Sequence, residues 1–177
     1  MKCIYYLTST LDSTSHITDN LHEAGISDWF IHVLSKDEAG LRKMKIHSSN
    51  YLEKLDILRF GILGAITGFI VGLFAANWMD SAKPFGPDVP LIVYFAIVGV
   101  FTAFGSWEGG LIGIASENKK IALFHEDIEA GKYLILIYAR EDRESTIKAV
   151  MDSKHPEAKL VAEDGYFYNP LTGLKRI

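Results

Sequence analysis

At 177 residues the chain has room for one domain, with or without an insertion. A formal net charge of −4, without a long run of lysine and arginine, argues against a nucleic-acid-binding protein. The single cysteine, Cys3, cannot form an internal disulfide, which suits a reducing compartment. The N-terminus enters a strand-like segment at once, so we expect no signal peptide.

The first fifty residues are typical of a strand, a helix and a second strand. Lys2–Leu7 is rich in strand-forming residues, and Trp29–Leu34 is a second segment of this kind. Between them, Ser13 or Thr14 is expected to cap a helix whose apolar residues recur at helical spacing and which Gly25 ends.

Two long apolar segments follow. Phe60–Met79 is uncharged, and Val89–Ser116 contains a single charge, Glu108. About 20 apolar residues span the hydrocarbon core of a bilayer. The sequence therefore predicts a transmembrane hairpin turning at residues 80–88, and a buried helical hairpin of a soluble protein is the alternative.

Basic residues predict the orientation of this hairpin. They gather before the first segment and after the second, whereas the turn holds only Lys83. By the positive-inside rule both termini face the cytoplasm, and we expect a multi-pass protein of the bacterial inner (cytoplasmic) membrane. The flanking basic residues are Arg42, Lys43, Lys45, Lys54, Arg59, Lys119 and Lys120.

The hairpin helices are expected to extend beyond the bilayer. Asn50 followed by Glu53 is a capping pattern, which predicts one helix running from Tyr51 into the first segment. The second helix is expected to continue to about Ala130, before Gly131. Opposite charges on these two extensions are then expected to pair: Glu53 and Asp56 with Lys119 and Lys120.

The last part of the chain again reads as strand, helix and strand, over Tyr133–Tyr138, Asp142–Ser153 and Lys159–Ala162. A β-α-β, insertion, β-α-β order is that of a ferredoxin-like, or split βαβ, domain of the α+β class. We therefore predict three regions: residues 1–50 and 131–177 as the halves of this domain, and residues 51–130 as the hairpin. The tail after Gly165 is expected to pack across the sheet or on a neighbouring subunit.

Glycines recur every four residues in both apolar segments. Small residues at this spacing let transmembrane helices approach closely. One glycine face can close the hairpin and leave the other for a neighbouring subunit, which predicts a homo-oligomer; alternatively, both faces meet within one chain. The glycines are Gly61, Gly64, Gly68 and Gly72 in the first segment, and Gly105, Gly109 and Gly113 in the second.

Glu108 is a candidate ion or proton site, because ionisable residues within membrane spans often mark such pathways. If the second span begins near Leu91, however, Glu108 lies close to the cytoplasmic edge, where it can pair with Arg59. A structural role is therefore the alternative.

Outside the hairpin the candidate sites are few. Ser13 and Thr14 open the first helix and are candidates for holding an anion or metabolite, with helix capping as the alternative. His47 and His125 are expected about ten residues from the membrane on opposite extensions, as a ligand or pH-sensing pair. The sequence shows no metal motif, no nucleophile motif and no cofactor motif, so an enzyme is not expected.

The Gly-rich hairpin, with a helix leading into EDIEAGKYLILIYA (Glu126–Ala139), resembles uncharacterised bacterial integral-membrane proteins related to the heat-induced general-stress family. The resemblance covers about Phe60–Ala139. It implies a small α/β domain that flanks or encloses the hairpin, and a membrane-associated role in stress or regulation. It supplies no catalytic residues.

Two functions follow from these observations. The first is a non-enzymatic membrane sensor, regulator or assembly protein whose cytosolic domain binds a small molecule or a protein partner. The second is a small homo-oligomeric channel or ion-transport component with Glu108 near the pore mouth.

Overall fold

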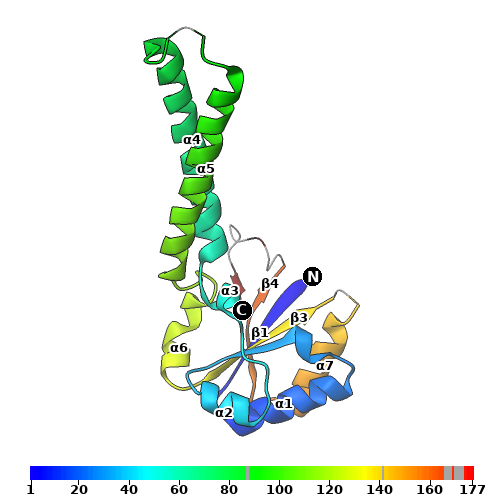
Figure 1. Ribbon diagram of the computed structural model, residues 1–177. Helices are drawn as coiled ribbons and strands as arrows, with labels where there is room; N and C mark the ends of the chain where they lie inside the picture. The colour runs from blue at the N-terminus through cyan, green and yellow to red at the C-terminus, as the bar shows by residue number, and fades with distance from the viewer. Residues whose placement is uncertain (87, 141, 166–168, 170–173) are drawn as a thin grey trace. The chain divides into compact units, whose positions relative to one another are not determined.

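The computed structural model describes residues 1–86, 88–140, 142–165, 169 and 174–177. The chain forms two compact units, one made of Met1–Tyr51 with Lys119–Ile177 and the other of Leu52–Asn118. The first unit combines helices with an antiparallel sheet, and the second is a pair of apolar helices (Figure 1).

The sheet has the strand order β2-β3-β1-β4-β5, and each neighbouring pair is antiparallel. The four longer strands lie where the sequence predicts strands. The expected strand from Trp29 begins later, because Asp28–Phe30 forms a 3-10 turn. The strands are β1 (Lys2–Thr8), β2 (Ile31–Leu34), β3 (Tyr133–Ala139), β4 (Lys159–Asp164) and β5 (Lys175–Arg176).

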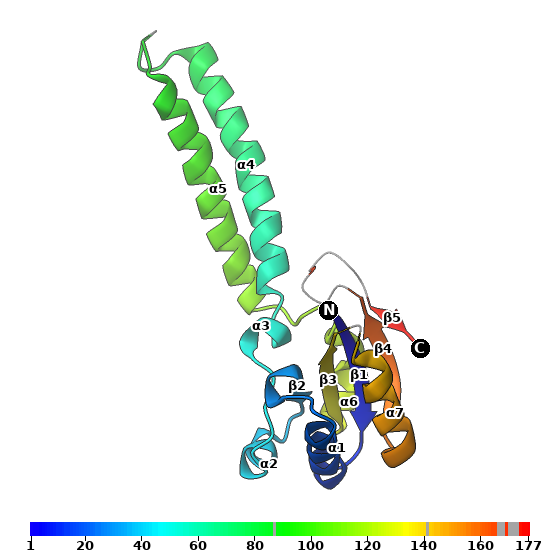
Figure 2. The same cartoon turned by 90° about the vertical axis from the view of Figure 1, so that its right-hand side faces the viewer.

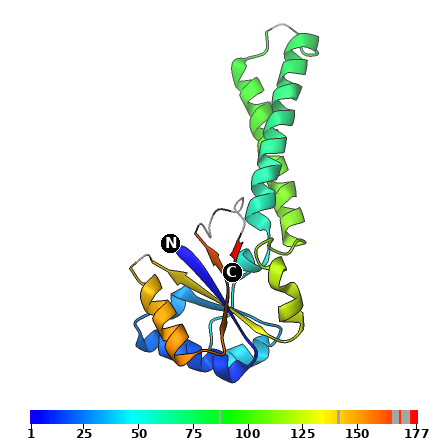
Figure 3. The same cartoon turned by 180° about the vertical axis from the view of Figure 1, so that it is seen from behind.

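Both faces of the sheet are covered. Helices α1 (Leu11–Glu23) and α7 (Glu144–Lys154) lie on the same face, in blue and orange in Figure 3. On that face Ile4 and Ile135 pack with apolar residues of both helices. On the other face Tyr5 and Leu136 pack with Phe124. Two-sided burial explains why β1 and β3 read as continuous apolar runs without alternation.

Helix α1 begins earlier than predicted. Thr10, in extended conformation, is its N-cap, and the Thr10 side chain accepts a hydrogen bond from the Ser13 amide at 3.2 Å. Ser13 and Thr14 therefore lie inside the first turn, and neither is the cap. The helix ends before Gly25, which has a φ of +82°, as predicted.

The second unit contains helices α4 (Ile57–Ala82) and α5 (Leu91–Ile114), which run side by side in two views at right angles (Figures 1 and 2). The predicted uninterrupted helix from Tyr51 is wrong, because α3 (Tyr51–Lys54) stops and α4 begins anew at Ile57. Leu55 pairs with Glu117 in a short antiparallel bridge, which takes the backbone out of helical conformation there.

The second helix also ends sooner than expected. Its last residue is Ile114, and the Asp56 amide bonds to the Ser116 carbonyl at 3.0 Å. A 3-10 turn (Ala122–Phe124) and a short helix α6 (His125–Glu129) then follow as separate elements. The hairpin thus spans a shorter region than the expected residues 51–130. Most of the predicted tail packing concerns residues outside the described part, although β5 pairs with β4.

Candidate functional site

Helices α4 and α5 are long and apolar enough to cross a membrane. At 1.5 Å per residue, helices of 26 and 24 residues are about 39 and 36 Å long, against a hydrocarbon core of about 30 Å. In their most apolar stretches only 11% and 0% of the residues are buried, unlike the core helices of a soluble protein. Their exposed side chains include Leu63, Ile66, Phe69, Ile70, Leu73, Phe74, Ile92, Phe95, Val100, Phe104 and Leu111.

Between the two helices the glycines meet backbone. A Cβ added to Gly64 would overlap the carbonyl oxygen of Gly105, and one added to Gly68 would overlap that of Phe101. At the two ends of this interface, a Cβ on Gly72 would lie 2.9 Å from the Val98 Cα. One on Gly113 would lie 2.6 Å from the Ile57 Cα. Side chains are excluded along this whole line, so the helix backbones themselves form the contact.

This packing decides between the two uses expected for the glycines. Gly105 and Gly109 face Gly64, and the glycine faces of both helices are therefore used inside one hairpin. Gly61 has looser contact, with the Ser106 carbonyl 3.8 Å from its added Cβ. The homo-oligomer remains a prediction, but neither glycine face is left over for it.

The charges near the base of the hairpin are arranged differently from the prediction. Arg59 binds Asp56, with 3.1 Å between Nη1 and Oδ2, so the expected pair between Arg59 and Glu108 does not form. Glu108 is exposed on α5 and makes no ion pair with any residue that the structure describes. Its neighbour Gly109 lies against the Phe60 carbonyl, so Glu108 is level with the first residue of the apolar segment.

Two further features agree with membrane boundaries at the ends of the hairpin. Trp78, near the end of α4, is 65% exposed, and Trp107, on α5 beside Glu108, is 59% exposed. Tryptophans at both ends of a span are typical of membrane interfaces. At the turn end Tyr94 donates a hydrogen bond to Asp80 at 3.3 Å, which joins the two helices.

Ser13 and Thr14, the candidates for an anion site, are engaged in other contacts. The Thr14 hydroxyl is buried and donates to the Thr10 carbonyl at 2.9 Å. The Ser13 hydroxyl donates to Glu157 at 2.7 Å, and this bond lowers the pKa of that carboxyl. A carboxylate beside Ser13 disfavours an anion there, so these contacts favour a role of Ser13 and Thr14 in helix packing.

His155, which the sequence analysis did not single out, connects this carboxylate with α1. It is buried, with Nδ1 3.2 Å from Glu157 and Nε2 3.1 Å from the Asn20 amide nitrogen. Lys154 donates to the Asn20 oxygen at 2.6 Å, so the Asn20 nitrogen is the donor to Nε2. This network holds the His155 ring as a fixed link between α1 and the end of α7.

His47 and His125 have different surroundings. The His47 ring stacks on His32, with centroids 5.5 Å apart, and meets Trp29 edge-on at 5.9 Å. His125 begins α6. The ring contacts of His47 thus lie with His32 and Trp29, and searching the described residues finds no group of three or more His, Cys, Asp or Glu that could hold a metal.

Lys120, which was expected to pair with an acid on the extension of the first helix, is buried and binds Asp164. Its ammonium lies 2.5 Å from the Asp164 carboxylate and 3.2 Å from the Asn169 carbonyl. Both side chains of the pair are almost fully shielded from solvent. No periodic pattern in the sequence predicts this pair, because Lys120 follows the hairpin and Asp164 ends a strand.

A second ion-pair network fixes α7 to the sheet. Lys148 bonds to Glu144 at 2.9 Å and to Glu163 at 2.6 Å, and Lys2 bonds to Glu144 at 2.8 Å. Hydrogen bonds from Lys148 and then Lys2 lower the pKa of Glu144, and those of Glu144 and Glu163 raise the pKa of Lys148. Beneath it, burial raises the pKa of the Tyr6 hydroxyl to about 12, so this group stays protonated at neutral pH.

No protein-family model and no curated protein matches this sequence.

Proposed function

We propose that the chain is a non-enzymatic integral-membrane protein in which a hairpin anchors a cytosolic sensor, regulator or assembly domain. The observation that carries this proposal is the arrangement of the hairpin. Glycines line the contact between α4 and α5, while large apolar side chains point away from it. Exposing such an apolar surface to water costs free energy, whereas the lipid tails of a bilayer solvate it.

The cytosolic domain is proposed to be ferredoxin-like. Strand order β2-β3-β1-β4, two helices on one face and the chain order β-α-β, hairpin, β-α-β support this assignment. In the proposed topology both termini are cytoplasmic, in a bacterial inner membrane, because basic residues flank the hairpin.

The polar clusters of the domain do not suggest catalysis. Those around His155 and Lys148 connect secondary-structure elements, so we assign them a structural role. We propose that the domain acts by binding a small molecule or a protein partner, and the resemblance to stress-related membrane proteins favours a role in stress or regulation. A homo-oligomer, if formed, would use the outer faces of the hairpin, where Gly99 and Gly110 have open space.

Alkaline carbonate extraction of bacterial membranes tests the anchoring. The wild-type chain is expected to stay in the pellet. Ile70→Arg, in the middle of α4, is expected to shift the chain toward the supernatant, because an arginine at a span centre costs about 2.5–3.5 kcal/mol on insertion scales. Lys83→Arg in the turn is the control and is expected to behave as wild type. Complete extraction of the wild-type chain would contradict the proposal.

A further inference from the structure

Four consecutive exposed residues stand at the C-terminus of α2 (Glu38–Lys43): Arg42, Lys43, Met44 and Lys45. The Lys45 amide bonds to the Arg42 carbonyl, and the Ile46 amide bonds to the Leu41 carbonyl at 2.9 Å. These two bonds form a Schellman motif, whose apolar contact is supplied by buried Leu41 and Ile46. The motif fixes the exposed residues in one turn on the surface.

Lys45 occupies a backbone conformation that favours glycine. Its φ is +59°, and it is the residue after the helix cap, where most helices of this kind carry glycine. A lysine retained at such a position places a cation there at a conformational cost. An outlier of this kind is a reason to look for a use of the side chain.

The three cationic side chains of this turn are not paired with carboxylates of the described residues. Across the described part of the chain, Arg42, Lys43 and Lys45 make no ion pair, and Arg42 reaches only the Glu38 carbonyl at 3.5 Å. The neighbouring acid Asp37 accepts from the Gly40 amide and from the Tyr133 hydroxyl.

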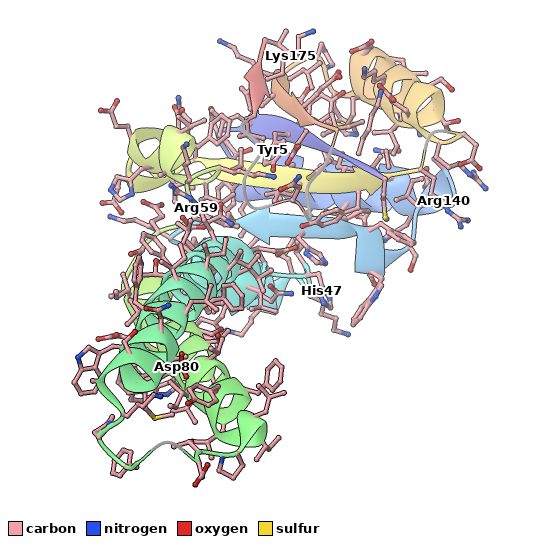
Figure 4. All side chains as sticks on the ribbon, turned by 90° about the horizontal axis from the view of Figure 1, so that it is seen from above. Tyr5, His47, Arg59, Asp80, Arg140 and Lys175 are labelled. Carbon is pink, nitrogen blue, oxygen red and sulfur yellow. The ribbon has the colours of Figure 1, made fainter. Side chains whose placement is uncertain are left out.

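Trp29 contacts a residue that follows this turn closely in the sequence. Its side chain is 73% exposed, and its ring meets His47, two residues beyond Lys45. His47 lies on the side of β2 away from Tyr5 in Figure 4, where the Val33 amide bonds to its carbonyl at 2.9 Å. Acidic Asp28, adjacent to Trp29, lies 2.7 Å from the His22 ring. An exposed indole and Met44 thus accompany three unpaired cations.

We propose that this surface, the basic patch formed by Trp29, Arg42, Lys43, Met44 and Lys45, binds anionic phospholipid headgroups of the bilayer in which the hairpin is anchored. The inference rests on the proposed anchoring. The cations match the negative leaflet surface, and indole and thioether groups suit the boundary between headgroups and acyl chains.

Chain connectivity favours lipid over a soluble acidic partner. Ile57, the first residue of α4, follows Lys45 by a segment that spans at most about 43 Å when extended. Attachment through so short a link gives a high effective concentration of bilayer surface, at which weak contacts suffice. Three cations alone would bind an untethered polyanion only weakly at physiological salt.

Tryptophan quenching by brominated lipid tests the proposal in the full-length chain. Trp78→Phe with Trp107→Phe leaves Trp29 as the only tryptophan. The protein is reconstituted into phosphatidylcholine vesicles with or without phosphatidylglycerol, with bromine near the headgroup end of the acyl chains. We expect strong quenching of Trp29 with phosphatidylglycerol and little without it. Each cation removed should lower the ratio of bound to free patch about fivefold.

Matched variants test whether the cations of the basic patch cause the quenching of Trp29. Arg42→Gln, Lys43→Gln and Lys45→Gln together should abolish the quenching. Arg140→Gln, Lys159→Gln and Lys175→Gln, which remove three exposed cations elsewhere, should keep it; Lys175 lies on β5, at the opposite edge of the sheet (Figure 4). Lys45→Gly, which suits the backbone, should fold normally and still reduce the quenching.

Three results would overturn the proposal: equal quenching in both lipids, quenching that is unchanged in the basic-patch variant, and no quenching in either lipid. The last of these would point to another partner, such as an acidic protein. A chain retaining only Trp78, in the same vesicles with bromine near the headgroup end of the acyl chains, reports insertion in parallel. If Trp78 is quenched and Trp29 is not, the patch proposal fails and the anchor stands; if Trp78 is not quenched, the anchoring itself fails.

Discussion

Gly64 and Gly105 occupy each other's side-chain space: a Cβ on either glycine would overlap the carbonyl oxygen of the other. This reciprocal contact lies inside the apolar hairpin, and in the membrane setting that we propose, lipid tails provide no hydrophobic force between helices. Dispersion between closely packed backbones therefore holds α4 to α5. The large side chains are left to face outward.

The first prediction concerns this contact. Gly105→Ala should destabilise the hairpin by about 1–3 kcal/mol, because the added methyl group forces the backbones apart. Gly99→Ala on the same helix has open space and should be neutral or stabilising by up to about 1 kcal/mol, from helix propensity. Unfolding in mixed micelles followed by circular dichroism measures both. Equal effects of the two substitutions would show that the glycine contact is not formed.

Lys45 provides a test in the unit that contains the sheet. Lys45→Gly should raise the free energy of unfolding by about 1 kcal/mol, because it removes a side chain from a left-handed backbone position. Lys43→Gly, inside α2, should instead lower it by up to about 1 kcal/mol. Urea denaturation of the detergent-solubilised protein gives both values. A loss of stability in Lys45→Gly would mean that Lys45 makes a stabilising contact.

The stability of the fold should depend on both members of the buried ion pair between Lys120 and Asp164. Lys120→Met leaves a buried carboxylate without its cation and should cost about 3–5 kcal/mol. Lys120→Met with Asp164→Leu should recover most of this loss, because both charges of the pair are then removed. The same denaturation experiment measures the recovery, and a double variant no more stable than Lys120→Met would contradict the account.

The bond between Ser13 and Glu157 predicts a pH dependence. It lowers the pKa of Glu157 in the folded state below the ordinary value of 4.5. Its stabilisation is therefore present above the unfolded pKa and is lost as the pH falls through the lowered folded value. Because Glu157 is half-exposed, the contribution should be under about 1 kcal/mol.

Ser13→Ala should therefore lower stability at pH 7 and have less effect in acid below the folded pKa of Glu157. Ser15→Ala on the same helix is the control and should be nearly neutral at both pH values. Thermal unfolding across the acid range measures the difference. A Ser13→Ala effect that does not vary with pH would assign the loss to packing.

Substitution of Glu108 distinguishes the proposed membrane anchor from the alternative channel. Because it is level with Phe60 at the start of the apolar segment, we expect Glu108→Gln to leave assembly and bilayer conductance unchanged. Planar-bilayer recordings of the purified protein test this. A wild-type conductance that Glu108→Gln reduces, with assembly intact, would favour the channel.

The elements predicted from the sequence are those whose pattern is local. Continuous apolar runs located β1 and β3, and apolar length located α4 and α5. The break before Ile57 was not predicted, because it depends on Leu55 pairing with Glu117, a residue distant in the sequence. The pair of Lys120 with Asp164 was not predicted for the same reason, because the two residues are distant in the sequence.

The candidate sites likewise divide into features that a local sequence pattern predicts and features that depend on residues distant in the sequence. The glycine spacing identified the residues of the helix contact but left their partner open, because a four-residue repeat describes one face only. The stacking of His47 on His32 was not predicted, because it depends on the parallel bridge between Val33 and Ser48, which brings His47 beside β2. Trp29 and Lys45 carried no motif, and their exposure and backbone conformation became visible only in the folded chain.

The most direct test of the proposed membrane hairpin is thiol labelling at its turn. Phe85 is 82% exposed, and the natural Cys3 is buried and can be retained. In spheroplasts a membrane-impermeant maleimide should label Phe85→Cys from outside, and should label Asp19→Cys, on α1, only after permeabilisation. Protection of Phe85→Cys until the membrane is opened would contradict a hairpin that crosses the bilayer.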